Sequence, residues 1–204
     1  MSGTLYPDEE QRRRIMDFIM AAGETLLQNG AEVFRVEQTM EIMAQSFHLR
    51  EFHVYVLTNG IFASAGTAEI SEVRNVPVRI THLGRVAAVN ELSRQIAAGS
   101  VTLDEAECRL AQAQHIPFPN GWVQLVAGMS GAFCFALIFG GTLRAGLVAA
   151  VAGFLASGHL FLCERRNISG GFKTISTAAL ITLLCILGCS LLRIGASHAI
   201  IGTL

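Results

Sequence analysis

Residues 122–141, WVQLVAGMSGAFCFALIFGG, decide the class of this protein. The stretch has no charged side chain, and Trp122 stands at its start, where an aromatic ring typically anchors a helix at the membrane–water interface. A helix needs about 20 apolar residues to cross a hydrocarbon core of about 30 Å. The stretch therefore predicts a membrane-spanning helix and, with it, an α-helical integral membrane protein.

Two further runs of the sequence have the same character. Residues 145–163 and 174–192 contain no Asp, Glu, Lys or Arg and are long enough to cross a membrane. Residues 196–204 resemble the beginning of a fourth span but are too short to complete it. We therefore expect at least three spans followed by a truncated fourth.

Charge separates the front of the chain from these spans. Of the 16 acidic residues, 15 precede Asn120, together with 10 of the 15 basic residues. The front is therefore net acidic and the remainder net basic, but neither has the concentrated basic surface of a nucleic-acid-binding protein, which excludes that class. We expect a soluble domain over residues 1–118 and a membrane domain over 119–204.

Four helices are predicted in the soluble domain. The first begins at Asp8-Glu9-Glu10, where acidic residues favour a helix N-terminus, and ends at Asn29-Gly30. The last begins at Thr102, which is followed by Glu105 in the spacing of a capping box. The two others are expected over residues 31–47 and 84–97.

A small sheet is predicted between the second and third of these helices. Residues 52–57 and 61–65 have strand character and flank Thr58-Asn59-Gly60, a hairpin turn signal. Residues 72–81 make a third strand, in which Pro77 lacks a backbone N–H and so favours an edge position or a kink. The soluble domain is therefore predicted to be an α+β domain with a small sheet packed on helices.

The loops predict which side of the membrane this domain occupies. The 164–173 loop has three basic residues and the 140–144 turn has one, and short loops rich in Lys and Arg stay in the cytoplasm. The charged N-terminus lacks the apolar core of a cleavable signal peptide. Both observations predict a multi-pass protein whose N-terminal domain lies in the cytoplasm.

Small residues are dense in the spans and predict close helix packing. The first span contains Gly128, Gly131 and Ala132, and the second contains Gly153 and Ser157 at four-residue spacing. Such faces let helix backbones approach closely in lipid. The partner helices belong either to further copies of the chain, forming a homo-oligomer, or to another protein.

Few side chains in the spans are suited to chemistry. His159 is the one histidine in the three spans, and it is interpreted either as a proton relay or substrate ligand or as a hydrogen-bonding partner of a neighbouring helix. Hydroxyl groups could line a path, although many bond their own backbone. They belong to Ser130, Ser157, Thr174, Ser176, Thr177, Thr182 and Ser190.

The soluble domain has two polar groups of interest. Arg35 and Glu37 are two residues apart on a predicted helix and point about 200° from each other, so they cannot bind one ligand together. Asn90, Ser93 and Arg94 share a face, which suits an anion, a contact with the membrane helices, or solvent.

Signatures of enzymes, metals and cofactors are absent from the sequence. It has no P-loop, no GxGxxG, no GxSxG and no HExxH motif. Its five cysteines lack metal-binding spacing. We therefore expect no enzymatic activity, no metal site and no cofactor.

Five segments carry a resemblance to a known family. They are residues 27–40 (LQNGAEVFRVEQTM), 58–64 (TNGIFAS), 89–96 (VNELSRQI), 139–141 (FGG) and 200–202 (IIG). In this order, after a soluble domain and before or within membrane spans, they resemble the threonine/serine exporter (ThrE-type) family, and specifically its N-terminal, YjjP-like portion. The resemblance extends over roughly residues 10–204.

The resemblance implies a subunit of a secondary active exporter in the bacterial inner (cytoplasmic) membrane. Family members export small polar metabolites, either threonine and serine or C4-dicarboxylates such as succinate, and are fused or split into two subunits. This chain resembles the longer subunit, which works with a small integral membrane partner. The motif residues and His159 become candidates for substrate binding or coupling: Gly30, Arg35, Glu37, Thr58, Gly60, Asn90, Ser93, Arg94, Gly140, Gly141 and His159.

The chain differs from the family pattern at two points. The pattern continues after Ile-Ile-Gly through a proline-containing segment and at least one more span. It also has an acidic residue shortly after Gly-Gly, where this chain has Arg144.

Two other functions are compatible with the sequence. A non-transporting regulatory or assembly protein would bind a small ligand through its cytoplasmic domain. A membrane-tethered hydrolase would require Arg35, Glu37 and His53 to converge. The lipid bilayer is a partner in each case, and nucleic acid is a partner in none.

Overall fold

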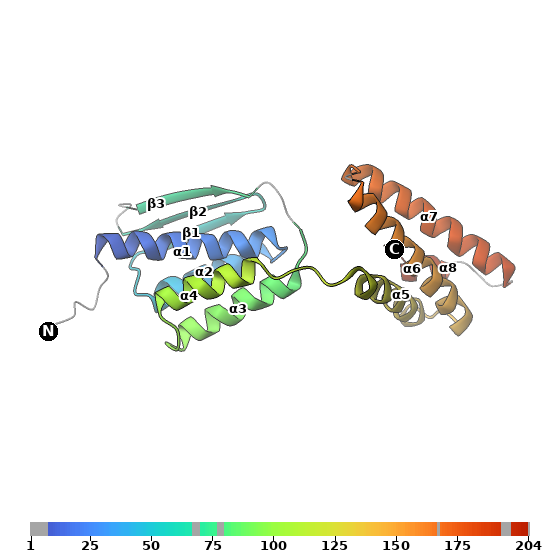
Figure 1. Cartoon of the computed structure of the whole chain (residues 1–204), viewed down its shortest axis with the longest axis horizontal. Coiled ribbons are helices and arrows are strands. Elements are labelled where there is room, and N and C mark those ends of the chain that lie inside the picture. Colours follow the sequence, from blue (N-terminus) through green and yellow to red (C-terminus); the bar gives the residue numbers. More distant parts are fainter. Residues whose placement is uncertain (1–7, 67–69, 77–79, 167, 193–196, 204) are drawn as a thin grey trace. The chain divides into compact units, whose positions relative to one another are not determined.

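The computed structural model describes residues 8–66, 70–76, 80–166, 168–192 and 197–203. It divides into two compact units, Met1–Phe118 and Pro119–Leu204. Within the described residues, the first unit has four helices and one three-stranded sheet, and the second has four helices (Figure 1).

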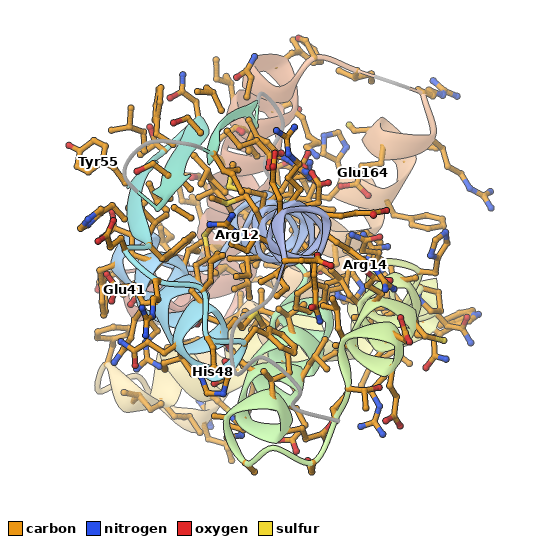
Figure 2. The ribbon with its side chains drawn as sticks, turned by 90° about the vertical axis from the view of Figure 1, so that its left-hand side faces the viewer. Arg12, Arg14, Glu41, His48, Tyr55 and Glu164 are labelled. Carbon is orange, nitrogen blue, oxygen red and sulfur yellow. The ribbon has the colours of Figure 1, made fainter. Side chains whose placement is uncertain are left out.

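Helix α1, Glu9–Gln28, is the central element of the first unit. Asp8 caps it by accepting a hydrogen bond from the Gln11 backbone N–H at 2.8 Å. Figure 2 looks along α1 and shows the sheet on one side and helices α3 (Leu83–Ala97) and α4 (Leu103–Gln114) on the other. Because α1 lies between two layers, residues around much of its circumference are buried, among them Met16, Ile19 and Met20.

The sheet is an antiparallel meander in the order β1-β2-β3. Its strands are β1 (His53–Leu57), β2 (Gly60–Ala65) and β3 (Ile70–Asn75). The prediction of a third strand over 72–81 was displaced: the strand begins at Ile70, and residues 80–81 are outside it. The chain leaves the sheet at Val76, whose N–H donates to the Asn59 carbonyl at 2.7 Å. Pro77 lies outside the described residues.

The hairpin between β1 and β2 is built differently from an Asn-Gly turn. Leu57 pairs with Gly60, so Thr58 and Asn59 are the two turn residues and Gly60 is already in β2. A Cβ on Gly60 would lie 3.2 Å from the Arg74 carbonyl oxygen. The glycine is therefore explained by the close approach of β3 rather than by the conformation of the turn.

Helices α1, α2 (Val33–Ser46) and α3 end in the same motif. Just beyond each helix, the N–H groups of two consecutive residues bond back to carbonyls of its last turn. The first of these two residues adopts a positive φ. Glycine occupies this position after α1 and α3, as Gly30 (φ +90°) and Gly99 (φ +67°). After α2 the residue is His48, with φ +56°.

Helix α4 begins at the predicted cap, but only half of the capping box forms. The Thr102 hydroxyl accepts a hydrogen bond from the Glu105 N–H at 3.4 Å. The Glu105 carboxylate instead accepts from Arg109, one turn further along, at 2.9 Å. An oppositely charged partner on the same helix face thus replaces the return bond to the cap.

The second unit consists of helices α5 (Gly121–Ile138), α6 (Leu143–Arg165), α7 (Gly170–Leu191) and α8 (Ser197–Thr203). Helices α5, α6 and α7 are each long and apolar enough to cross a membrane. They correspond to the three predicted spans, with limits shifted by one to four residues, the largest shift being the start of α7 at Gly170 rather than residue 174. Helix α8 has only seven residues.

Small residues allow these helices to pack closely. A Cβ on Gly153 of α6 would lie 2.7 Å from both the Ala132 Cβ and the Gly128 carbonyl oxygen of α5. A Cβ on Gly202 of α8 would lie 2.6 Å from the Ala136 nitrogen. The small-residue faces seen in the sequence are therefore used, at least in part, for contacts within the chain itself.

Candidate functional site

A groove of about 530 Å³ lies between the helices of the second unit. Its volume falls in the range of about 300–1,000 Å³ that is usual for small-molecule sites. We call it the hydroxyl groove, after the four hydroxyl side chains among its lining residues. The lining residues are Gly128, Gly131, Ala132, Phe135, Gly153, Ala156, Ser157, Leu160, Thr174, Thr177, Ala178, Ile181, Gly202 and Thr203.

Three of the four hydroxyl groups present acceptors rather than donors. Thr174 donates to the Gly170 carbonyl at 3.0 Å, Thr177 to the Lys173 carbonyl at 2.7 Å, and Thr203 to the Ile200 carbonyl at 3.2 Å. A hydroxyl has a single hydrogen, so the oxygens of Thr174 and Thr177 keep a lone pair for a ligand once that hydrogen is committed to the backbone. The Thr203 oxygen also lies 3.3 Å from the Cys185 Sγ. The groove is therefore suited to a ligand that supplies N–H or O–H donors.

The groove is uncharged over its described lining residues, since none of them is Asp, Glu, Lys, Arg or His. Burying an ion without a partner costs far more than burying a hydrogen-bonded polar group. An anion would therefore find no countercharge among these residues. Nor does the described part of the chain contain a group of three His, Cys, Asp or Glu residues that could hold a metal ion.

His159 of α6 lies outside the lining of the groove and bonds to the neighbouring helix. Its Nε2 lies 3.0 Å from the Ser176 Oγ of α7 and 3.4 Å from the Cys163 Sγ. Ser176 uses its own hydrogen on the Lys173 carbonyl, at 3.1 Å. The His159–Ser176 hydrogen bond joins α6 to α7, which is the helix-to-helix contact described by one of the two sequence interpretations.

Four glycines of the candidate set have conformational or packing roles. Gly30 and Gly140 adopt positive φ values of +90° and +85° at the ends of α1 and α5. Directly after the C-terminus of α5, the Gly140 N–H donates to the Leu137 carbonyl at 3.0 Å and the Gly141 N–H to the Ala136 carbonyl at 2.9 Å. These two bonds end the helix. Gly60 permits the close approach of β3. These roles account for Gly30, Gly60 and Gly140 without a ligand, whereas the N–H of Gly141 is one that any residue except proline would supply.

Glu37 has a defined partner in the sheet. Its Oε1 accepts a hydrogen bond from the Val56 backbone N–H at 2.8 Å. Strand β1 pairs only with β2, so the carboxylate covers an amide on the free edge of the sheet. Arg35 is exposed and points to Glu32, at 3.9 Å, while Thr58 is exposed in the hairpin turn.

The polar face expected on α3 is not assembled as one open surface. Ser93 is buried in the first unit, whereas Arg94 is exposed and Asn90 is half-buried. Arg94 makes two hydrogen bonds to one carboxylate oxygen of Glu91, at 2.5 and 3.0 Å. These hydrogen bonds, reinforced by one from Gln95, lower the pKa of Glu91.

The structure thus brings together some of the side chains that the sequence singles out, but not those of the motifs. Ser157, Thr174 and Thr177 line one groove, as the hydroxyl pattern of the spans suggests. Thr203 was missed because it lies beyond the three predicted spans. Its position in the same groove follows from the packing of α8 against α5, which its Gly202 makes possible.

Comparisons with known proteins agree with this architecture. The ThrE family, described as "Putative threonine/serine exporter", matches residues 17–204. A "Probable threonine/serine exporter" of Mycobacterium tuberculosis is 26% identical over 184 residues, which cover 88% of this chain and 35% of that protein. The chain therefore spans about a third of the length of this relative. No solved structure matches the chain. With nearly its whole length matched, the chain belongs to the threonine/serine exporter family.

Proposed function

We propose that the chain is the larger subunit of a secondary exporter and that the hydroxyl groove is part of the path of its substrate. Helices α5, α6 and α7 would cross the inner membrane, and the Met1–Phe118 unit would lie in the cytoplasm, as the basic 164–173 loop suggests. The observation that carries the proposal is a groove of suitable volume, lined by hydroxyl acceptors and placed between apolar helices.

The chemistry of the groove favours a hydroxy amino acid over a dicarboxylate. Threonine and serine bring an ammonium and a hydroxyl group, both of which can donate to Thr174 and Thr177. Their one carboxylate is accompanied by their own ammonium. A C4-dicarboxylate brings two negative charges and no strong donor, and the described groove residues offer it no cation.

A small integral membrane partner subunit would complete the transporter. Most side chains of α5, α6 and α7 are not buried within the chain, and many of them are large and apolar. A relative of about three times the covered length contains further sequence that this chain does not match. A second subunit could cover the open side of the groove. Its movement against this chain could open the groove first to one side of the membrane and then to the other, as export requires.

The proposal is tested by export from cells that lack their own copy of the chain and receive variants of it. The cells are loaded with labelled threonine or with labelled succinate, and the release of each is followed. Thr177→Val removes a groove acceptor at nearly constant volume and should slow export by roughly three- to tenfold, the value of one hydrogen bond. Thr182→Val removes a hydroxyl of the same helix that does not line the groove, and should leave export near the wild-type rate.

Two results would contradict the proposal. Equal effects of Thr177→Val and Thr182→Val would remove the groove from the substrate path. Release of succinate in preference to threonine would reverse the assignment of the substrate class.

A further inference from the structure

The outer face of the sheet in the first unit is apolar and uncovered. Tyr55, Phe62 and Val73 stand side by side on β1, β2 and β3, because Tyr55 pairs with Phe62 and Phe62 with Val73. Their exposed fractions are 63%, 43% and 65%. Figure 2 shows Tyr55 pointing outward, away from the ribbon. We call this row and its outward-facing neighbours the sheet face.

The sheet face is also free of carboxylates and of Lys and Arg. Besides the apolar row, the outward positions are held by His53, Leu57, Gly60, Ser64, Ser71 and Asn75. The charges of β3 lie on the opposite face, where Arg74 bonds to Glu72 at 2.7 Å and reaches Glu24 of α1 at 3.3 Å. The sheet face is thus an electrically neutral patch on the first unit, whose sequence is net acidic.

This neutrality discriminates between possible occupants. An anionic membrane surface would be repelled by the acidic segment and would find no Lys or Arg on the sheet face to attract it. A strongly charged protein would find no complementary charge. A second copy of the same face meets neither obstacle, because two neutral faces can approach without repulsion.

The register makes the sheet face complementary to itself. Phe62 lies on the central strand, with an apolar neighbour on each side. A two-fold axis lying between two such faces and parallel to β2 places Phe62 opposite Phe62 of the second copy, and Tyr55 opposite its Val73. The same axis places His53 opposite Ser71 of the second copy. The central apolar row therefore meets itself across the axis and the His53 row meets its own polar residues, whereas Leu57 comes opposite Asn75 of the second copy. The self-matching of the central row is what an isologous contact requires.

The area of the face sets the strength of this contact. Three strands spaced about 4.8 Å apart, with five residues of about 3.3 Å each, cover roughly 250 Å². Stable soluble complexes bury about 800 Å² on each partner. The contact is therefore too small to hold free monomers together, but chains anchored in one bilayer have a far higher effective concentration.

We infer that the sheet face pairs with the sheet face of a second copy of this chain when both are anchored in the same membrane. The inference uses the membrane anchoring of the proposed function but not its transport activity. It assigns the N-terminal unit a role in assembly, with Phe62 on the symmetry axis and Tyr55 facing the Val73 of the second copy.

The test is energy transfer between donor-labelled and acceptor-labelled full-length chains in liposomes, measured over a range of lipid dilutions. Wild-type chains should associate. Phe62→Glu alone and Phe62→Lys alone should each lower association at least tenfold, because like charges meet on the axis. An equal mixture of the two variants should restore association, because opposite charges then meet. Phe34, which is 61% exposed on α2, supplies the control: Phe34→Glu and Phe34→Lys should change nothing.

A second pair keeps the test informative if a charge at position 62 disturbs folding. Tyr55→Glu copies should associate weakly with themselves and more strongly with Val73→Lys copies. Absence of wild-type association would overturn the inference, as would association that Phe62→Glu leaves unchanged, or charge mixtures that fail to restore it in both pairs. Export is not part of the readout, so a failure of the proposed transport function would remain distinguishable from a failure of the inferred pairing of sheet faces.

Discussion

At the scale of single residues, Glu37 shows how a motif residue acquires a structural role. Its carboxylate accepts the Val56 N–H at the free edge of β1. Exposed edge amides are sites at which other chains can add strands, and proteins protect them in several ways. Here the protection is a side chain from α2, and Val56 itself is almost fully buried, at 3% exposure.

Removing this carboxylate should loosen the edge of the sheet. In Glu37→Ala the buried amide loses its acceptor, and we expect a loss of about 1–3 kcal/mol in unfolding free energy. Hydrogen–deuterium exchange of the peptide containing residues 53–57 should accelerate. Glu41→Ala, an exposed change on the same helix, is the control and should leave exchange in this peptide as in the wild type. Unchanged exchange in Glu37→Ala would show that the hydrogen bond contributes nothing.

His48 is a second residue whose local conformation has a measurable cost. It occupies the left-handed position after α2 that glycine holds after α1 and α3 (Figure 2). For a residue with a Cβ this conformation costs about 1–2 kcal/mol. His48→Gly should therefore stabilise the first unit by about 1 kcal/mol, measured as a higher unfolding temperature in calorimetry.

The opposite change at an equivalent position provides the control for His48. Gly99 has φ +67°, and a Cβ there would meet no atom within 4 Å, so Gly99→Ala introduces backbone strain without a clash. It should lower the unfolding temperature. A decrease in both variants would mean that the His48 side chain makes a contribution larger than its backbone strain.

At the scale of elements, the packing of α5 on α6 depends on Gly153. Its missing Cβ is the space into which Ala132 and the Gly128 carbonyl fit. Gly153→Ala should force the helices apart at the wall of the hydroxyl groove and cost about 1–3 kcal/mol, as overpacked cores do. Thermal unfolding in detergent measures the loss, and export should fall with it.

Gly131 is the matched control on the other side of that interface. It also lines the groove, but a Cβ there would meet nothing within 4 Å. Because alanine is the better helix former, Gly131→Ala should leave stability unchanged or slightly raised. Equal destabilisation by both alanines would indicate that close helix approach is not what requires Gly153.

The elements also show where sequence reasoning succeeds and where it stops. Uncharged length alone predicts α5, α6 and α7, because crossing a hydrocarbon core needs little more than that. The third strand was displaced, because its limits depend on pairing with β2, where Ala65 meets Ile70 and Gly60 meets Asn75. Periodicity along one segment contains no information about such a register.

The candidate site likewise has a part that the sequence predicts and a part that depends on three-dimensional packing. Hydroxyl side chains in uncharged helices can be listed from sequence, and Ser157, Thr174 and Thr177 do line one groove. Which hydroxyls converge depends on helix rotation and crossing, which small residues such as Gly153 set only in three dimensions. Motif spacing in the first unit instead singled out helix ends and a protected strand edge, because these also demand particular residues.

At the scale of the whole molecule, the proposed orientation can be tested independently of transport. If the chain has the proposed orientation, a thiol at Arg144→Cys, in the first turn of α6, would face outward. A thiol at Arg166→Cys, after α6, would face the cytoplasm. Membrane-impermeant maleimide should label the first in intact spheroplasts and the second only after permeabilisation.

Native cysteines determine the background of that experiment. Cys108 and Cys134 are exposed, whereas Cys163, Cys185 and Cys189 are buried. Cys108 in the first unit should itself react only after permeabilisation, which reports the side of that unit, and Cys108→Ser with Cys134→Ser clears the signal for the two introduced thiols. Labelling of Cys108 in intact spheroplasts would place the first unit outside.

The hydrogen bond from Val56 to Glu37 also has a consequence for biosynthesis. A ribosome releases α2 before β1, so the carboxylate at position 37 has already left the exit tunnel when the strand at 53–57 emerges. The first edge of the nascent sheet can therefore be shielded as it leaves the tunnel, before β2 and β3 emerge. If the carboxylate emerged after the strand, the edge amide would stay uncovered for longer. On crowded polysomes, neighbouring copies of the same unfinished chain could then pair with that edge.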